Sequence, residues 1–180
     1  MIKFTFNKNV LYIISILVLF IIPIFTIITN SSTLKDGTEY LFEVEAFDPY
    51  DMFRGNYLNI SFKEDTVKGN LTDNQSYHSK DCYVTIGKNR DGFAYFKKVS
   101  ESKPENTTDY FKTTGYYSRY LNEYRIETPT RYYMNEEKSL IAEQTYRDNI
   151  DSTYVKVRVK NGKMVIVGVY VNDILIDTID

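Results

Sequence analysis

Residues 154–171 read YVKVRVKNGKMVIVGVYV, and this stretch decides the fold of the chain. In its first half, three valines alternate with basic side chains, which is the period-two pattern of a strand with one buried face. Asn161-Gly162 follows and is the strongest short signal for a hairpin turn. Residues 164–171 are apolar on both faces, which predicts a strand inside a sheet. The chain therefore contains a β-hairpin at the centre of its folded part.

Similar alternation occurs along most of the preceding sequence. Strands are predicted over residues 39–47, 57–62, 82–87, 93–99, 110–115 and 124–127. The turn-forming segment 89–92 joins two of them into a hairpin. Two polar segments, residues 63–80 and 101–108, are predicted to be loops. A second turn at Asn172-Asp173 precedes a last strand over residues 174–179.

One helix is predicted late in the chain, over residues 136–149. Asn135 is a favourable N-cap residue, and Glu136 lies in the first turn, where the helix dipole favours acidic side chains. The fold class expected from these patterns is mostly β, a β-rich α+β domain. It consists of one antiparallel sheet or small barrel with a single late helix.

The chain begins with an apolar segment, because residues 10–28 (VLYIISILVLFIIPIFTII) contain no charged side chain. A helix of about 20 residues crosses the hydrocarbon core of a bilayer. The run is longer than the apolar region of a signal peptide, and no A-x-A-like site follows it. We therefore expect an uncleaved anchor that contacts the lipid bilayer; a cleaved signal peptide is the alternative.

Basic residues on the two flanks predict the orientation of this anchor. Lys3 and Lys8 precede it, and the next basic residue, Lys35, stands beside Asp36. Positive charge stays on the cytoplasmic side of a membrane. The expected organisation is a cytoplasmic N-terminus over residues 1–9, an anchor over 10–28, a linker over 29–37 and an exported domain over 38–180. In a bacterium this is a single-pass protein of the inner membrane with its domain in the periplasm.

Composition excludes several functions. Two of the 22 basic residues precede residue 30 and no acidic residue does, so the exported part carries 20 basic and 24 acidic side chains. This balance argues against nucleic acid as a partner. Cys82 is the single cysteine, so an intramolecular disulfide cannot form. No cofactor-binding motif is present.

Few residues are candidates for chemistry. Asp48 and Asp51 stand close to Arg54, and paired carboxylates can bind a metal or perform acid–base work. An arginine beside them instead favours an ion pair that fixes a turn. His78 and Cys82 are the only His–Cys combination, and they leave a zinc site without enough ligands. We therefore predict no metal site and assign no catalytic residue.

Residues 48–62, DPYDMFRGNYLNISF, resemble the motif of the GDYXXLXY proteins, DPxDxxRGDYxxLxY. Gly55 and Tyr57 match that motif. Asn56 replaces the aspartate, Ile60 the leucine and Phe62 the last tyrosine. The loss of the aspartate weakens any mechanism that needs a carboxylate there. A structural role for Gly55 in a turn and for Tyr57 in packing is unaffected.

A second segment, residues 131–137 (RYYMNEE), is similar to a stretch in family members from Bacteroidota, and similar AE and YR pairs follow at 142–143 and 146–147. The resemblance covers nearly the whole exported part. It implies a bacterial membrane-anchored protein, often encoded beside multi-spanning membrane proteins, and supplies no catalytic residue. It marks the interaction candidates Arg131, Tyr132, Tyr133 and Glu136, together with Asp48, Asp51, Arg54, Gly55, Asn56 and Tyr57.

The function expected is that of a non-enzymatic, membrane-anchored accessory protein whose exported domain binds or organises another envelope protein. A multi-spanning membrane protein is the expected partner. Two alternatives stay open. One is an envelope hydrolase with a Ser–Lys or acidic site. The other is a small-ligand or glycan sensor that uses tyrosines such as Tyr116, Tyr117, Tyr120 and Tyr124 as stacking platforms.

Overall fold

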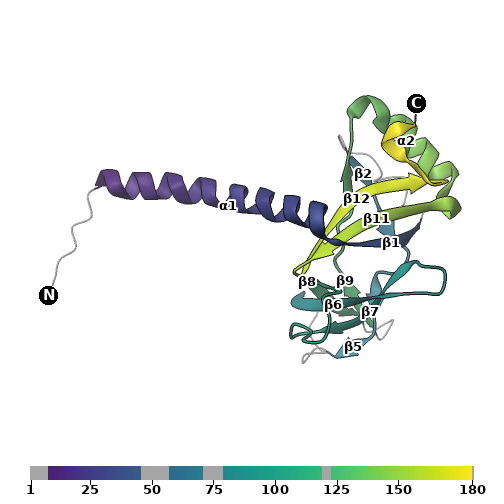
Figure 1. Ribbon diagram of the computed structural model, residues 1–180, viewed down its shortest axis with the longest axis horizontal. Coiled ribbons are helices and arrows are strands. Elements are labelled where there is room, and N and C mark those ends of the chain that lie inside the picture. The colour runs from purple at the N-terminus through teal and green to yellow at the C-terminus, as the bar shows by residue number, and fades with distance from the viewer. Residues whose placement is uncertain (1–7, 46–56, 71–78, 119–122, 180) are drawn as a thin grey trace.

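A computed structural model of the chain describes residues 8–45, 57–70, 79–118 and 123–179 (Figure 1). It begins with helix α1, Lys8–Asp36, which projects away from a β-rich domain. The apolar side chains of α1 are exposed along its length, and the helix is long and apolar enough to cross a membrane. This architecture fits a single-pass membrane protein.

The helix continues through residues 29–36, which the sequence analysis assigned to a linker. Hydroxyl groups in this part bond back to the helix: Thr33 Oγ1 donates to the carbonyl of Thr29 at 3.0 Å. Only Gly37 separates the end of α1 from strand β1, Thr38–Glu45. The Gly37 amide still donates to the carbonyl of Thr33 at 2.9 Å, which closes the last turn of the helix.

The predicted hairpin is confirmed and lies at the centre of a five-stranded sheet in the order β13-β12-β11-β1-β3. Asn161 and Gly162 both have positive φ, as do Asn172 and Asp173 in the next turn. Turns with two positive φ angles match the twist of antiparallel strands. The other strands of this sheet are β3 (Ser61–Phe62), β11 (Thr153–Lys160), β12 (Lys163–Val171) and β13 (Ile174–Leu175).

A six-stranded sheet, in the order β4-β9-β8-β6-β7-β5, forms the rest of the barrel-like domain. The predicted hairpin around residues 89–92 joins β6 to β7, and Asn89 Oδ1 accepts from the amides of Asp91 and Phe93. The strands are β4 (Thr66–Val67), β5 (Gly69–Asn70), β6 (Lys80–Lys88), β7 (Ala94–Ser100), β8 (Tyr110–Ser118) and β9 (Glu123–Ile126). Strand β5 runs parallel to β7, and the other pairs are antiparallel.

The predicted strand over residues 57–62 is divided between two sheets. Its first part, β2 (Tyr57–Asn59), pairs with β10 (Arg131–Tyr133) in a two-stranded ribbon. Its second part, β3, pairs with β1. Ile60 lies between them, fully buried, and its amide donates to the carbonyl of Thr130 at 2.7 Å. One alternating segment therefore ties the ribbon to the central sheet.

Aromatic rings from both large sheets form the middle of the core. The Phe42 ring on β1 lies 5.3 Å from that of Phe62 and 4.8 Å from that of Phe96, measured between centroids. Phe96 also contacts Phe111 on β8, at 5.6 Å. Rings at these separations gain attraction beyond the burial of their area. These rings join the two sheets through side chains, and a backbone hydrogen bond of 2.7 Å from the Lys112 amide to the Gly162 carbonyl joins them as well.

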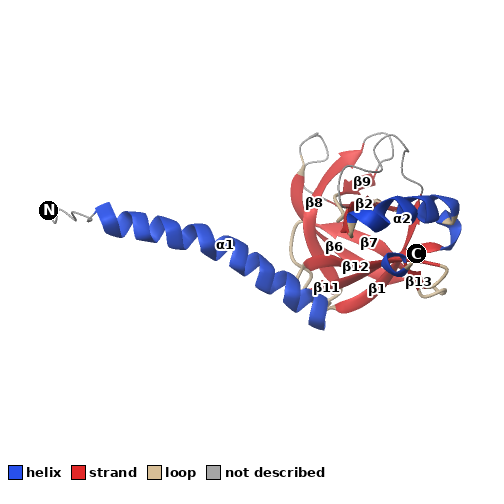
Figure 2. Cartoon of the chain, turned by 90° about the horizontal axis from the view of Figure 1, so that it is seen from above, coloured by secondary structure: helices blue, strands red, loops and turns tan. Residues whose placement is uncertain are grey.

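The late helix, α2 (Glu136–Asp148), is confirmed with its predicted cap: Asn135 Oδ1 accepts from the Glu137 amide at 3.2 Å. Ala142 and Tyr146 are buried on its inner face, and the Tyr146 hydroxyl donates to the carbonyl of Glu45 at 3.0 Å. Figure 2 shows α2 at the end of the domain that lies away from the free end of α1.

Two predicted segments differ from the structure. Residues 63–80, expected to be a loop, contain the two-residue strands β4 and β5. Residues 174–179 were expected to be a strand. They are extended only in β13 and then form a short 3-10 helix, η2 (Ile176–Thr178). The first such helix, η1 (Ile150–Ser152), joins α2 to β11. Ile176 is buried, so the last turn closes the core under α2.

Candidate functional site

The ribbon formed by β2 and β10 brings the two motif segments together. Tyr57 stands opposite Tyr133, and Leu58 stands opposite Tyr132. Because side chains alternate across a strand, Tyr57 and Tyr133 share one face of the ribbon. Leu58 and Tyr132 share the opposite face. The two motif segments, β2 and β10, are about 70 residues apart in the sequence and nevertheless form one local structure.

The outer face of this ribbon carries a small aromatic and cationic cluster, which we call the motif face: Tyr57, Arg131 and Tyr133. The rings of Tyr57 and Tyr133 are 5.7 Å apart between centroids. The guanidinium carbon of Arg131 lies 5.0 Å from the centroid of the Tyr57 ring, which is a cation–π distance. Tyr133 is 66% exposed, so much of the cluster is available to a partner.

The inner face of the ribbon is part of the core. Leu58 is fully buried. The Tyr132 hydroxyl donates to Asp177 Oδ2 at 2.7 Å. Burial, together with the Asp177 carboxylate, raises the pKa of the Tyr132 phenol above its ordinary value. A phenol held in its neutral form is a hydrogen-bond donor and not a base, so this pair fixes structure rather than moving protons.

The positions that the family motif names are mainly core positions here. Ile60 stands where the motif has leucine and is fully buried. Phe62 stands where the motif has its last tyrosine, and it is 2% exposed against Phe42. A buried ring without a hydroxyl needs no polar partner, which explains why phenylalanine fits this place. At Ile60 and Phe62 the motif therefore marks packing, whereas its Tyr57 lies on the motif face.

Several predicted site residues lie outside the described residues. These are Asp48, Asp51, Arg54, Gly55 and Asn56, together with His78 and Tyr120. Glu136 is the first residue of α2, and its side chain is not described. The predicted ion pair of Arg54 with the carboxylates of Asp48 or Asp51 therefore stays a prediction.

Cys82 lies in β6 and is fully buried. Burial, with the carboxylates of Asp81 and Glu127 nearby, raises the pKa of its thiol to about 11. The thiolate is the nucleophilic form of cysteine, so at neutral pH this side chain is inert.

Of the tyrosines considered as stacking platforms, the three that the structure describes, Tyr116, Tyr117 and Tyr124, do not share one surface. Tyr124 is buried, with its ring 5.2 Å from that of Tyr117 on the paired strand. Tyr116 is exposed and lines a pocket of about 450 Å³ with Asp65 and Arg125. Arg125 Nε donates to Asp65 Oδ2 at 2.5 Å, so the charges in this pocket satisfy each other.

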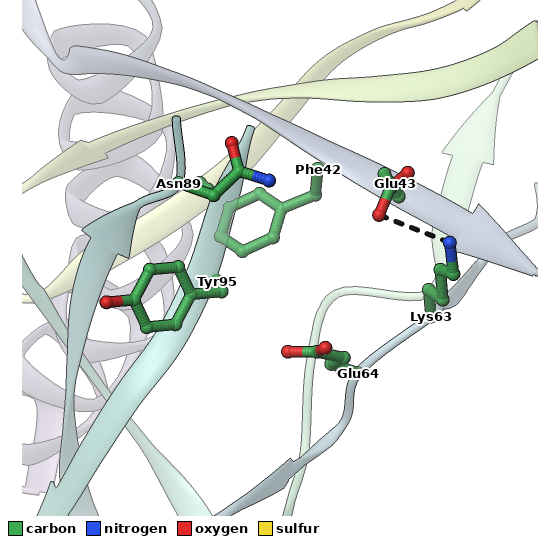
Figure 3. A pocket seen from close by; sticks show the side chains of 7 residues that line it. Phe42, Glu43, Lys63, Glu64, Asn89 and Tyr95 are labelled. Atoms are coloured by element: carbon green, nitrogen blue, oxygen red, sulfur yellow. Dashed lines mark hydrogen bonds and ion pairs between the residues drawn. The ribbon is translucent and has the colours of Figure 1, made fainter. Parts of the chain in front are cut away.

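A second polar pocket, of about 220 Å³, opens beside the aromatic core (Figure 3). Glu43 and Lys63 form an ion pair of 3.3 Å on one side of it, and Asn89 and Tyr95 lie on the other. It contains none of the residues predicted from the sequence. Within the described ranges, no group of three or more His, Cys, Asp or Glu side chains is placed to hold a metal ion.

The structure also brings together a serine and a lysine, which the sequence alone could not pair. Lys160 Nζ donates to Ser32 Oγ at 2.9 Å, where the end of α1 meets the β11–β12 hairpin. The same amine is 2.9 Å from Asp36 Oδ2. A catalytic lysine must take the proton of the serine hydroxyl, whereas this amine donates to both the hydroxyl and the carboxylate. The contact is therefore arranged as an ion pair with an added hydroxyl.

Comparison with known proteins supports the resemblance found in the sequence. The family model described as GDYXXLXY protein matches residues 19–169, which include α1 beyond its first turns, the ribbon and the central hairpin. No curated protein matches the chain, and no solved structure does. Because the family model covers most of its length, the chain belongs to the GDYXXLXY family.

Proposed function

We propose that this chain is a membrane-anchored accessory protein of the bacterial cell envelope, whose exported domain binds another membrane or envelope protein. The observation that carries this proposal is the motif face, where Tyr57, Arg131 and Tyr133 meet on the surface. Tyrosine and arginine are enriched among the residues that dominate protein interfaces.

Helix α2 adds apolar surface close to the motif face. It begins three residues after Tyr133, and Figures 1 and 2 both show it beside β2. Leu140 is 72% exposed and Ile141 is also exposed. Exposed apolar side chains on a helix that begins close to an aromatic and arginine cluster suit a protein partner. A multi-spanning membrane protein is the partner proposed, since α1 is long and apolar enough to lie in the same bilayer.

The orientation proposed has the N-terminus in the cytoplasm and the domain in the periplasm. Lys3 and Lys8 support it, because they precede the apolar run. Alkaline phosphatase folds only outside the cytoplasm, whereas green fluorescent protein exported unfolded stays dark. A fusion of alkaline phosphatase after Asp180 should therefore be enzymatically active, and a fusion of green fluorescent protein at the same place should not fluoresce. The reverse pattern would contradict the orientation.

Photo-crosslinking tests the motif face directly. The full-length protein would carry a photoreactive phenylalanine at Tyr133 or, as the matched control, at the exposed Tyr95 on β7. Illumination in native membranes, followed by mass spectrometry, should give one stoichiometric multi-spanning protein from position 133 and not from 95. Arg131→Ala should weaken that product. Equal products from both positions, or none from 133, would contradict the proposal.

A hydrolase is the second candidate, and the contact between Ser32 and Lys160 is the observation that favours it. A fluorophosphonate probe modifies activated serines. If Ser32 is a nucleophile, the full-length protein in membranes should be labelled and Ser32→Ala should not. Labelling that is absent, or that persists in Ser32→Ala, would leave the contact a structural one.

A further inference from the structure

The end of α1 packs on the β11–β12 hairpin through a set of polar contacts that we call the helix–hairpin junction: Thr29, Ser32 and Asp36 on the helix, with Lys160 and Lys163 on the hairpin. Lys163 Nζ donates to Thr29 Oγ1 at 3.0 Å, and Lys160 Nζ contacts both Ser32 and Asp36. Both ammonium groups are thereby held against the helix.

A pocket of about 510 Å³ lies at this junction. Its walls differ in chemistry. On one side are Phe25 and Ile28, whose side chains are 66% and 60% exposed on the apolar part of α1. On the other side are the hydroxyls of the junction and the two lysines. An occupant must therefore be apolar at one end and polar or anionic at the other.

The pocket also lies at a defined depth. The apolar run ends at Ile28, and its 19 residues span about 28 Å as a helix, close to the hydrocarbon thickness of a bilayer. Thr29, which holds Lys163, is the next residue. With α1 inserted, the lysines stand at the level of the lipid headgroups, and the Phe25 and Ile28 side chains face the acyl chains.

We propose that this pocket binds one anionic phospholipid of the leaflet next to the domain. Its phosphodiester would contact Lys163 and Lys160, and an acyl chain would lie along Phe25 and Ile28. Lys160 is neutralised in part by Asp36, whereas Lys163 is held by a hydroxyl, so a net positive charge faces the headgroup. The inference rests on the anchored arrangement proposed above.

Native mass spectrometry of the full-length protein, released from nanodiscs with equal phosphatidylglycerol and phosphatidylcholine, tests this inference. The wild type should retain one phosphatidylglycerol in preference to phosphatidylcholine. Lys163→Gln should lower that retention about fivefold, which is the effect of one lysine near an anionic surface. Lys97→Gln, which removes an exposed charge on β7, should retain the lipid as the wild type does.

Equal retention of the two lipids, or unchanged retention in Lys163→Gln, would overturn the inference. Loss of the bound mass on adding inorganic phosphate would also overturn it, because an acyl chain should hold the lipid in place. The intact mass separates this result from a failure of the anchor. If the protein isolated from membranes has lost its N-terminal helix by cleavage, both the lipid site and the proposed anchor are overturned. If the chain is intact but carries no lipid, the lipid site alone is overturned, and the proposed anchor and motif face stand.

Discussion

The Tyr132 hydroxyl donates a hydrogen bond of 2.7 Å to Asp177 Oδ2, across 45 positions of the sequence. It connects β10, which carries the second motif segment, to η2 close to the end of the chain. Asp177 Oδ1 is buried and has no hydrogen-bond partner in the part of the chain that the structure describes. The carboxylate therefore depends on Tyr132, and the contact holds the C-terminal turn under the ribbon.

Tyr132→Phe should lower the free energy of unfolding by about 1–3 kcal/mol, because it leaves a buried carboxylate without its donor. Urea unfolding followed by circular dichroism at neutral pH would measure the change. Tyr133→Phe is the matched control, since its exposed ring should leave stability within about 0.5 kcal/mol of the wild type. Equal effects of the two substitutions would contradict the assignment.

Stability should also fall as the pH rises above about 10. Burial raises the pKa values of Tyr40, Tyr132 and Tyr146 above the ordinary value of 10.0. The folded chain then binds more protons than the unfolded chain above that pH, so raising the pH favours unfolding. Urea midpoints measured on both sides of pH 10 would show the loss, and Tyr132→Phe should reduce its slope.

Tyr146→Ala should release α2 from the domain. The side chain is 1% exposed and also donates to the carbonyl of Glu45, so truncation leaves a cavity and an unpaired acceptor. The expected cost is about 3–5 kcal/mol. Leu140→Ala on the outer side of the same helix should cost at most about 0.5 kcal/mol. Thermal unfolding of both variants would check the contrast, and similar melting temperatures would refute it.

Gly37→Ala should loosen the passage from α1 to β1. A Cβ at this position would lie 2.5 Å from the carbonyl oxygen of Thr33 and 3.2 Å from the amide of Val159, both backbone atoms. Backbone must then shift, at a cost of about 1–3 kcal/mol. Limited proteolysis should cut the variant near this residue faster than the wild type. Ser31→Ala, a change at an exposed position nearly two helical turns earlier, serves as the control.

Cys82 should react with a thiol reagent only when the chain unfolds. Its sulfur is buried and its pKa is raised to about 11, so the native protein at neutral pH holds almost no thiolate. Ellman's reagent, followed with and without denaturant, gives an unambiguous signal because the chain has one cysteine. Rapid stoichiometric labelling of the native protein would contradict the buried placement.

Much of the fold could be predicted from residues that act locally. Asn161-Gly162 specifies its own turn, and the alternating valines before it specify which face is buried. Asn135 marks the start of α2 because its side chain accepts a hydrogen bond from the Glu137 amide in the first turn of the same helix. Residues 66–67 and 69–70 are too short to show a period, so β4 and β5 could not be recognised.

The candidate site depends on pairings that no local pattern reveals. The tyrosines at 57 and 133 become neighbours through the register of β2 and β10. Resemblance to one family pointed to both segments, but not to their contact. The hydrogen bond from Lys160 to Ser32 likewise needs the hairpin to fold onto the helix. Residues 174–179 begin with three apolar side chains, which favours a strand, but burial of Ile176 favours a closing turn instead.

Because a single residue, Gly37, lies between α1 and β1, the β-rich domain follows the helix without a spacer. If α1 lies in a bilayer as proposed, the helix itself sets the height of the domain above the lipid and its direction around the helix axis. The proposed partner would then approach the motif face from one direction and at one distance. A tilt imposed on the helix inside the bilayer would in turn appear as a displacement of that face, at the far end of a stiff arm.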